Sequence, residues 1–237
     1  MTLDVALRLG RVSNLPTVWT NVVAAAALAG APLARPAVVA AALACSILYV
    51  GGMFLNDAFD REIDARERPE RPIPAGLVSA REVFVGGFGL LAAGVAMLAV
   101  TGRSASGSVL PGGAAGAALA AAIVWYDVRH KDNPLAPLLM GTCRALVYVA
   151  AAAALTGAVG AGVVAWAGVL LAYLIALTAV ARHPRLGLQS GLVARLIAGI
   201  AIVDGIAVAG TGHPVAAGWC IAAFVLTLAW QRRVSGT

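Results

Sequence analysis

Apolar residues occur along this chain in long runs, not in the alternation that marks strands or the narrow stripe of a soluble helix. A helix that crosses a membrane needs roughly 20 mainly apolar residues. Eight segments approach that length: 15–31, 36–56, 82–101, 109–126, 134–156, 160–181, 191–210 and 213–230. The pattern predicts an all-α fold, a polytopic membrane bundle of about eight transmembrane helices, in a single domain over residues 1–237.

The composition agrees with a membrane protein. Hydrophobic residues make up 61% of the chain, charged residues only 12%, and the mean hydropathy is +0.89. Soluble domains are about half apolar and about a quarter charged. The composition therefore argues against an ordinary soluble domain, and it makes membrane lipid the expected surroundings.

The net charge of +6 reflects basic residues that lie mostly between the apolar runs. With eight spans, thirteen of these residues fall on the side of the two termini, and only Arg35 and Arg103 fall on the other. Basic loops mark the cytoplasmic side. We expect a protein of the bacterial inner membrane, with both termini on the cytoplasmic side. Nucleic acid is not an expected partner, since no basic face lies outside the membrane.

The segment after the second span carries most of the acids. It reads NDAFDREIDARERPERPIPAG from Asn56 to Gly76, within an expected cytoplasmic loop of about 57–81. If the helix continues past Asn56, then Asp57, Asp60 and Asp64 share one face. Like charges on one face repel each other, and Mg²⁺, which prefers carboxylate and water oxygens, would relieve that repulsion. The alternative is a solvated acidic loop balanced by its arginines.

A second polar loop follows the fourth span and reads WYDVRHKDNP from Trp125 to Pro134. Arg129 and Lys131 could neutralise phosphate oxygens, and the hydroxyl of Tyr126 could donate a hydrogen bond. The alternative is a basic loop that ends at a helix-starting Asn-Pro.

These motifs together resemble the UbiA-type intramembrane prenyltransferase family: N-D-x-x-D-x-x-x-D, then R-P-x-P-x-G, then Y-x-x-x-x-K. The resemblance implies a helical bundle around a central cavity that binds an isoprenyl diphosphate through Mg²⁺ at its cytoplasmic end. It implies that Asn56 and the three aspartates hold the metal, and that Tyr126 and Lys131 meet the diphosphate. On this basis the catalytic residues are expected to be Asp57, Asp60, Asp64 and Lys131.

The chain also departs from the pattern of that family. Members usually carry a second Asp-rich motif after span six, but the corresponding segment here reads ARHPRLGLQSG and holds no acid. Arg182 and Arg185 could contact the phosphate directly in place of a second metal. The family typically has nine spans where this chain has eight.

Charged residues inside spans are rare and usually face the interior of a bundle. Arg144 in the fifth span and Asp204 in the seventh could form an ion pair that fixes the helix register, or Arg144 could reach a substrate. The amide of Asn21 could line the cavity near the diphosphate or bind a neighbouring backbone.

The expected function is Mg²⁺-dependent transfer of an isoprenyl group from its diphosphate to an aromatic or other small lipophilic acceptor. Two alternatives stay open. One is a membrane terpene cyclase that uses the same allylic cation within one molecule. The other is a protein that binds or translocates a lipid diphosphate without chemistry.

Overall fold

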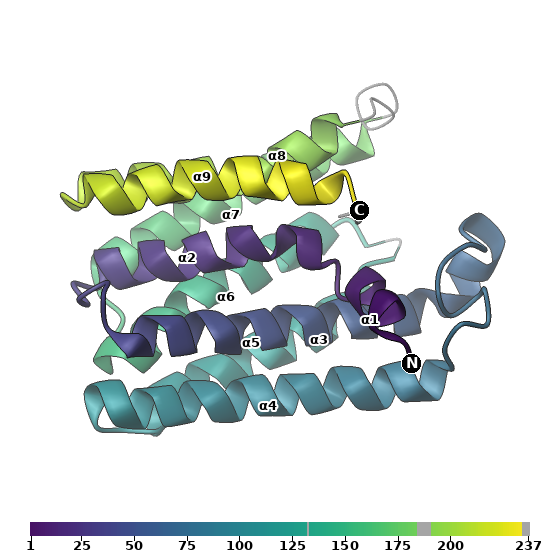
Figure 1. Cartoon of the computed structure of the whole chain (residues 1–237), viewed down its shortest axis with the longest axis horizontal. Coiled ribbons are helices and arrows are strands. Elements are labelled where there is room, and N and C mark those ends of the chain that lie inside the picture. The colour runs from purple at the N-terminus through teal and green to yellow at the C-terminus, as the bar shows by residue number, and fades with distance from the viewer. Residues whose placement is uncertain (132, 184–190, 234–237) are drawn as a thin grey trace.

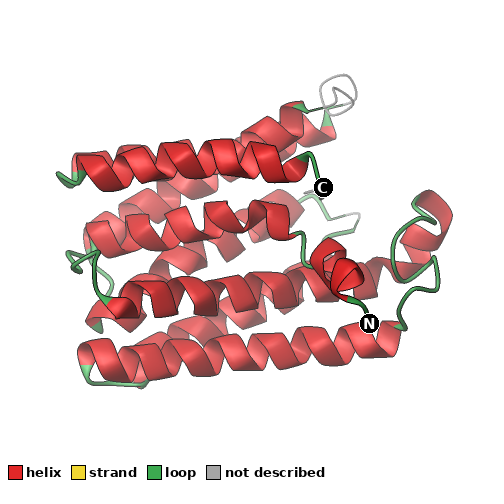
Figure 2. Cartoon of the chain, viewed as in Figure 1, coloured by secondary structure: helices red, strands yellow, loops and turns green. Residues whose placement is uncertain are grey.

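The computed structural model describes residues 1–131, 133–183 and 191–233, and in these residues the secondary structure is entirely helical (Figures 1 and 2). The helices are α1 (Leu3–Leu9), a short 3-10 turn η1 (Val12–Asn14), α2 (Leu15–Leu28), α3 (Pro36–Glu67), α4 (Ala80–Ser106), α5 (Leu110–Arg129), α6 (Ala136–Thr156), α7 (Ala161–Arg182), α8 (Leu192–Gly210) and α9 (Pro214–Gln231).

The helices α2 to α9 coincide with the eight expected spans, which confirms the all-α bundle. Within the described residues, six of them are long and apolar enough to cross a membrane: α3, α4, α6, α7, α8 and α9. Helix α2 has only 14 residues. Helix α5 has 20 residues but is rich in glycine and alanine. The number of eight spans is therefore approximate.

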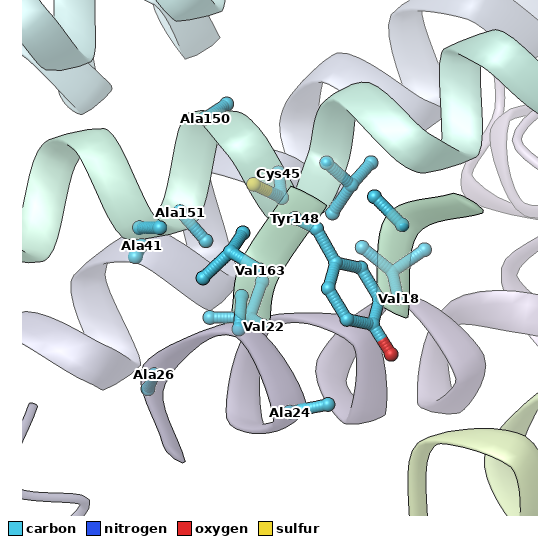
Figure 3. Close-up of a cluster of buried hydrophobic side chains, with 14 of the residues drawn as sticks. Val18, Val22, Ala24, Ala26, Ala41, Cys45, Tyr148, Ala150, Ala151 and Val163 are labelled. Atoms are coloured by element: carbon cyan, nitrogen blue, oxygen red, sulfur yellow. The ribbon is translucent and has the colours of Figure 1, made fainter. Parts of the chain in front are cut away.

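The helices run side by side along the bundle, with α2 between α3 and α9 in the nearer layer of Figure 1. The start of α1 and the end of α9 lie at the same end of the bundle as the end of α3. We call this the acidic end. Around Tyr148, the core is built from small alanine and valine side chains of α2, α3, α6 and α7 (Figure 3). Small side chains let helix backbones approach closely.

Glycine makes one of these close approaches possible. A Cβ atom at Gly112 of α5 would lie 2.6 Å from the backbone oxygen of Leu98 in α4 and 3.0 Å from the Cβ of Ala154 in α6. A backbone oxygen cannot move aside as a flexible side chain can. Three helices therefore meet at a point where only glycine fits.

The acidic segment is helical for longer than a loop of 57–81 would imply. Helix α3 continues to Glu67, because no glycine or proline interrupts residues 54–68. It ends where Pro69 disfavours helical geometry at the preceding Arg68 (φ −145°, ψ 61°). Ser79 then begins α4 with a capping box, in which its side chain and that of Glu82 satisfy each other's backbone amides. Only residues 68–79 form a connection.

Candidate active site

The three aspartates of the first motif lie on one buried face of α3. Asp57, Asp60 and Asp64 are 7%, 4% and 2% exposed, and the neighbouring Asn56 is 6% exposed. This follows from the spacing of three and four residues along a continuous helix. Buried carboxylates need compensating cations, and the structure supplies them from several parts of the chain.

Two arginines neutralise the outer carboxylates. The guanidinium of Arg11 donates to Oδ1 of Asp57 at 2.9 Å and to Oδ1 of Asn56 at 3.2 Å. Arg71, from the connection after α3, donates to Oδ1 of Asp57 at 3.2 Å and to Oδ2 of Asp64 at 2.8 Å. The N-terminal segment and the connection after α3 thus both contact the acidic face of α3.

Asp60 is paired with the end of α5. Lys131 Nζ lies 3.2 Å and His130 Nε2 3.3 Å from Oδ2 of Asp60. Burial lowers the pKa of His130. The hydrogen bond to Asp60 and the charge of that carboxylate raise the pKa by more than burial lowers it, so the pKa lies above the usual 6.5. The other ring nitrogen faces the backbone oxygens of Tyr126 and Asp127. Acceptors at both nitrogens favour the doubly protonated, cationic imidazole.

A cavity of about 290 Å³ lies inside the bundle next to this cluster, as expected for a central cavity. Its walls come from η1, α2, α3, α5, α6, α7 and α8 and are mostly aliphatic. The polar or charged side chains in the wall are Arg11, Asn14, Tyr49, Tyr126, Asp127, Arg144 and Thr178. The three aspartates of α3 and Asn56 do not themselves line the cavity. Arg11 and Asp127 do, and both contact Asn56.

Deeper in the bundle, Arg144 and Asp204 do not form the expected ion pair. Asn21 lies between them: Arg144 donates to Oδ1 of Asn21 at 3.0 Å, and Nδ2 of Asn21 donates to Asp204 at 2.9 and 3.0 Å. The hydroxyls of Thr20 and Tyr148 also donate to Asp204. Three donors satisfy the carboxylate without the arginine, which explains why a direct pair is unnecessary.

Arg144 is a partly buried cation that lines the cavity. Besides Asn21, it donates to the hydroxyl of Thr17 at 3.1 Å, and its guanidinium carbon lies 5.3 Å from the centre of the Tyr49 ring. In the described part of the chain it has no carboxylate within 4 Å. Asn21 itself is fully buried and does not line the cavity. It holds Arg144 in place through the hydrogen bond that it accepts on the side away from the cavity.

Of the other site residues predicted from the sequence, some line the cavity and some do not. Tyr126 lines the cavity and stacks on His130 with ring centres 4.9 Å apart. Arg129 and Arg182 are exposed at the ends of α5 and α7, and neither lines the cavity. Arg185 lies outside the described residues.

Two residues of this site were missed from the sequence. From the sequence, Arg11 is one of the thirteen basic residues that indicate the cytoplasmic side; its left-handed backbone (φ 43°) and its contact with Asp57 make it part of the site. Such a conformation costs roughly 1–3 kcal/mol and persists where the surroundings enforce it. Asp127 was overlooked beside Tyr126; an acid in the last turn of a span was the available signal.

The donor set suits Mg²⁺, a hard cation that takes oxygen ligands. Among the described residues, no three side chains of His, Cys, Asp or Glu converge closely enough to hold a metal alone. That agrees with the usual Mg²⁺ site, which combines one or two carboxylates with substrate phosphates and water. The Oδ2 atom of Asp127, buried and without a hydrogen-bond partner, is a further free oxygen at this end of the cavity.

Fold and site together define a helical membrane protein with a cluster of buried carboxylates at one end of an apolar cavity. The model of the UbiA prenyltransferase family matches residues 15–235, and the chain belongs to that family. It is an integral multi-pass membrane protein.

Curated relatives share part of the sequence. Digeranylgeranylglyceryl phosphate synthase of Methanopyrus kandleri is 36% identical over 143 residues, which is 58% of this chain and 49% of that protein. The synthase of Ignicoccus hospitalis is 42% identical over 88 residues, 37% of this chain and 28% of that protein. The chain thus matches about half or less of the length of these relatives.

Two solved structures share the fold. A structure from a study of digeranylgeranylglyceryl phosphate synthase in membranes aligns with a TM-score of 0.63 at 14% identity, covering 96% of this chain and 94% of the other. A UbiA homologue from Archaeoglobus fulgidus bound to DMAPP and Mg²⁺ aligns with a TM-score of 0.57 at 16% identity, covering 96% and 88%. At these identities the likeness concerns the fold.

Proposed function

We propose that this protein transfers an isoprenyl group from an isoprenyl diphosphate to a small lipophilic or aromatic acceptor, with Mg²⁺ held at the acidic end. The observation that carries the proposal is the buried face of Asp57, Asp60 and Asp64, which lies at the end of an apolar cavity. The Archaeoglobus fulgidus homologue, described as bound to DMAPP and Mg²⁺, supports the class of ligand.

Asn56, Asp57, Asp60 and Asp64 would hold the metal. When bound, Mg²⁺ would offset charge on the diphosphate and so make it a better leaving group. The protein's own cations would assist from the sides: Arg11 and Arg71 near Asp57, and His130 and Lys131 near Asp60. Charge-assisted hydrogen bonds to phosphate are among the strongest that side chains make.

The reaction would break the bond between the allylic carbon and the diphosphate oxygen, leaving an allylic cation in the cavity. Aliphatic walls exclude water, which would otherwise capture that cation. A nucleophilic atom of the acceptor then bonds to the allylic carbon and loses a proton.

Arg144 would hold the polar part of a substrate. It is a cation in an aliphatic wall, fixed by its hydrogen bonds to Asn21 and Thr17. Of the other cations predicted from sequence, Arg129 and Arg182 are exposed at helix ends and would act only by drawing the diphosphate toward the membrane surface. We further propose that the acidic end and both termini face the cytoplasm, in line with the positive-inside distribution of arginines.

The test is release of diphosphate by the purified protein with Mg²⁺ and a panel of isoprenyl diphosphates of different length. Release that depends on an added acceptor is the expected result. Release without acceptor would indicate cyclisation instead. Tight binding with no release would indicate a non-catalytic binding or translocation protein and overturn the proposal. Chelation of Mg²⁺ should abolish release in either enzymatic case.

A further inference from the structure

Asp127 differs from the other acids at this end of the bundle. The three aspartates of α3 each have a cationic partner within 4 Å, whereas Asp127 has none among the described residues. It is 3% exposed. Its Oδ1 accepts a hydrogen bond of 3.3 Å from Nδ2 of Asn56, while its Oδ2 has no hydrogen-bond partner. A buried carboxylate oxygen left unpaired is costly, which calls for a ligand.

The position of Asp127 is also particular. Among the described residues it is the acid that lines the central cavity, and it lies on α5, across from the acidic face of α3. Asp60 and Arg11 are both near enough to act on it electrostatically. Its contact with Asn56 ties it directly to the first motif. The acidic set therefore extends from α3 across to α5 at the cavity mouth.

We propose that Asp127 is a further ligand of the divalent cation, supplied from α5, across from the acidic face of α3. Its carboxylate provides an oxygen ligand of the kind that a second Asp-rich motif would supply, and the segment after α7 holds no acid in this chain. With Asn56 and the α3 carboxylates on one side and Asp127 on the other, the cation and its diphosphate would be held at the acidic end of the cavity. This inference rests on the proposed function, because it assumes a divalent cation at the acidic end.

The experiment measures cation binding and not turnover. The full chain in detergent is titrated with Mn²⁺ in the presence of one equivalent of inorganic diphosphate, and protein-bound Mn²⁺ is quantified by electron paramagnetic resonance. Loss of even an outer-shell partner typically weakens metal binding about 10–100-fold. We expect Asp127→Asn to raise the apparent Kd at least ~10-fold, and Asp60→Asn to do the same. Asp4→Asn, an exposed carboxylate of α1, should leave it unchanged.

A second variant separates ligation from folding. Asp127→Cys offers a thiolate, which prefers softer metals such as Cd²⁺ to Mn²⁺. It should lose Mn²⁺ affinity and gain Cd²⁺ affinity relative to the wild type, whose Cys143 in the same cavity sets the baseline. Failure of Cd²⁺ to bind more tightly would show a structural role and overturn the inference.

The outcomes distinguish this inference from the proposed function. If Asp60→Asn loses Mn²⁺ while Asp127→Asn binds like the wild type, the role of Asp127 is overturned and the acidic site on α3 stands. If neither substitution changes binding, or if the wild type binds no Mn²⁺, the proposed metal site itself is overturned.

Discussion

Arg11 and Asp57, 46 positions apart in the sequence, are joined by a hydrogen-bonded ion pair of 2.9 Å. The pair ties the N-terminal segment to the acidic end of α3. Only 18% of the Arg11 side chain and 8% of the Asp57 side chain is exposed, so water screens the interaction weakly. The contact also fixes Arg11 in the cavity wall, where its charge faces the space proposed for the diphosphate.

Arg11→Gln should weaken binding of an isoprenyl diphosphate about 10-fold, because hydrogen bonds to charged groups contribute about 1.5–3 kcal/mol. The measurement is the Kd for the diphosphate substrate in the presence of Mg²⁺. Arg8→Gln is the matched control, since Arg8 is exposed and, within the described part of the chain, its side chain donates only to the backbone oxygen of Glu70. Equal affinities for the two variants would contradict a role for Arg11 in binding.

Asp60→Asn should lower kcat/KM for diphosphate release about 100-fold or more, because the Mg²⁺ that this carboxylate would hold stabilises the negative charge that develops on the diphosphate. Glu62→Gln, two residues along the same helix, is the control: the Glu62 side chain is 80% exposed and, among the residues that the structure describes, forms an ion pair only with Arg61. Steady-state kinetics on both variants, with Mg²⁺ varied, makes the comparison. A loss of similar size in Glu62→Gln would indicate a general need for negative charge at the membrane surface.

Asp204→Asn should destabilise the fold by about 3 kcal/mol, because Thr20, Asn21 and Tyr148 all donate to this carboxylate and an amide accepts less strongly. Tyr148→Phe removes a single donor and should cost about 1.5 kcal/mol. Thermal unfolding in detergent gives the order of stability. Turnover per folded molecule should stay near the wild-type value; lost turnover with unchanged stability would assign Asp204 to the chemistry instead.

Gly112→Ala should destabilise the bundle by roughly 1–3 kcal/mol, the usual cost of overpacking. The added methyl group would meet the backbone oxygen of Leu98 at 2.6 Å. Gly89→Ala, on the outer side of α4 with no atom within 4 Å of the new Cβ, should be neutral or stabilising, since alanine favours helices. Equal melting temperatures for the two variants would show that α4 and α5 can separate at this point.

The sequence was sufficient for the bundle and for the acidic face. Long apolar runs predict the helices, and the spacing of Asp57, Asp60 and Asp64 predicts a shared face once the helix continues. The partners of these acids could not be predicted, because Arg11 and Lys131 come from segments far away in the chain. Likewise, two opposite charges in spans suggested a direct pair of Arg144 with Asp204. Only the packing shows Asn21 between them.

The internal pairing of charges at the end of α3 has a consequence for how ligands enter. Asp57 and Asp64 already hold arginines, and Asp60 holds Lys131. An incoming Mg²⁺–diphosphate complex would exchange partners with them, the metal taking the carboxylates and the diphosphate taking the freed cations. The region would then keep its balance of charge throughout. Metal alone would leave the arginines and Lys131 without carboxylate partners, and diphosphate alone would leave the carboxylates without cations. Such a site would therefore bind the metal and the diphosphate together more readily than either one by itself.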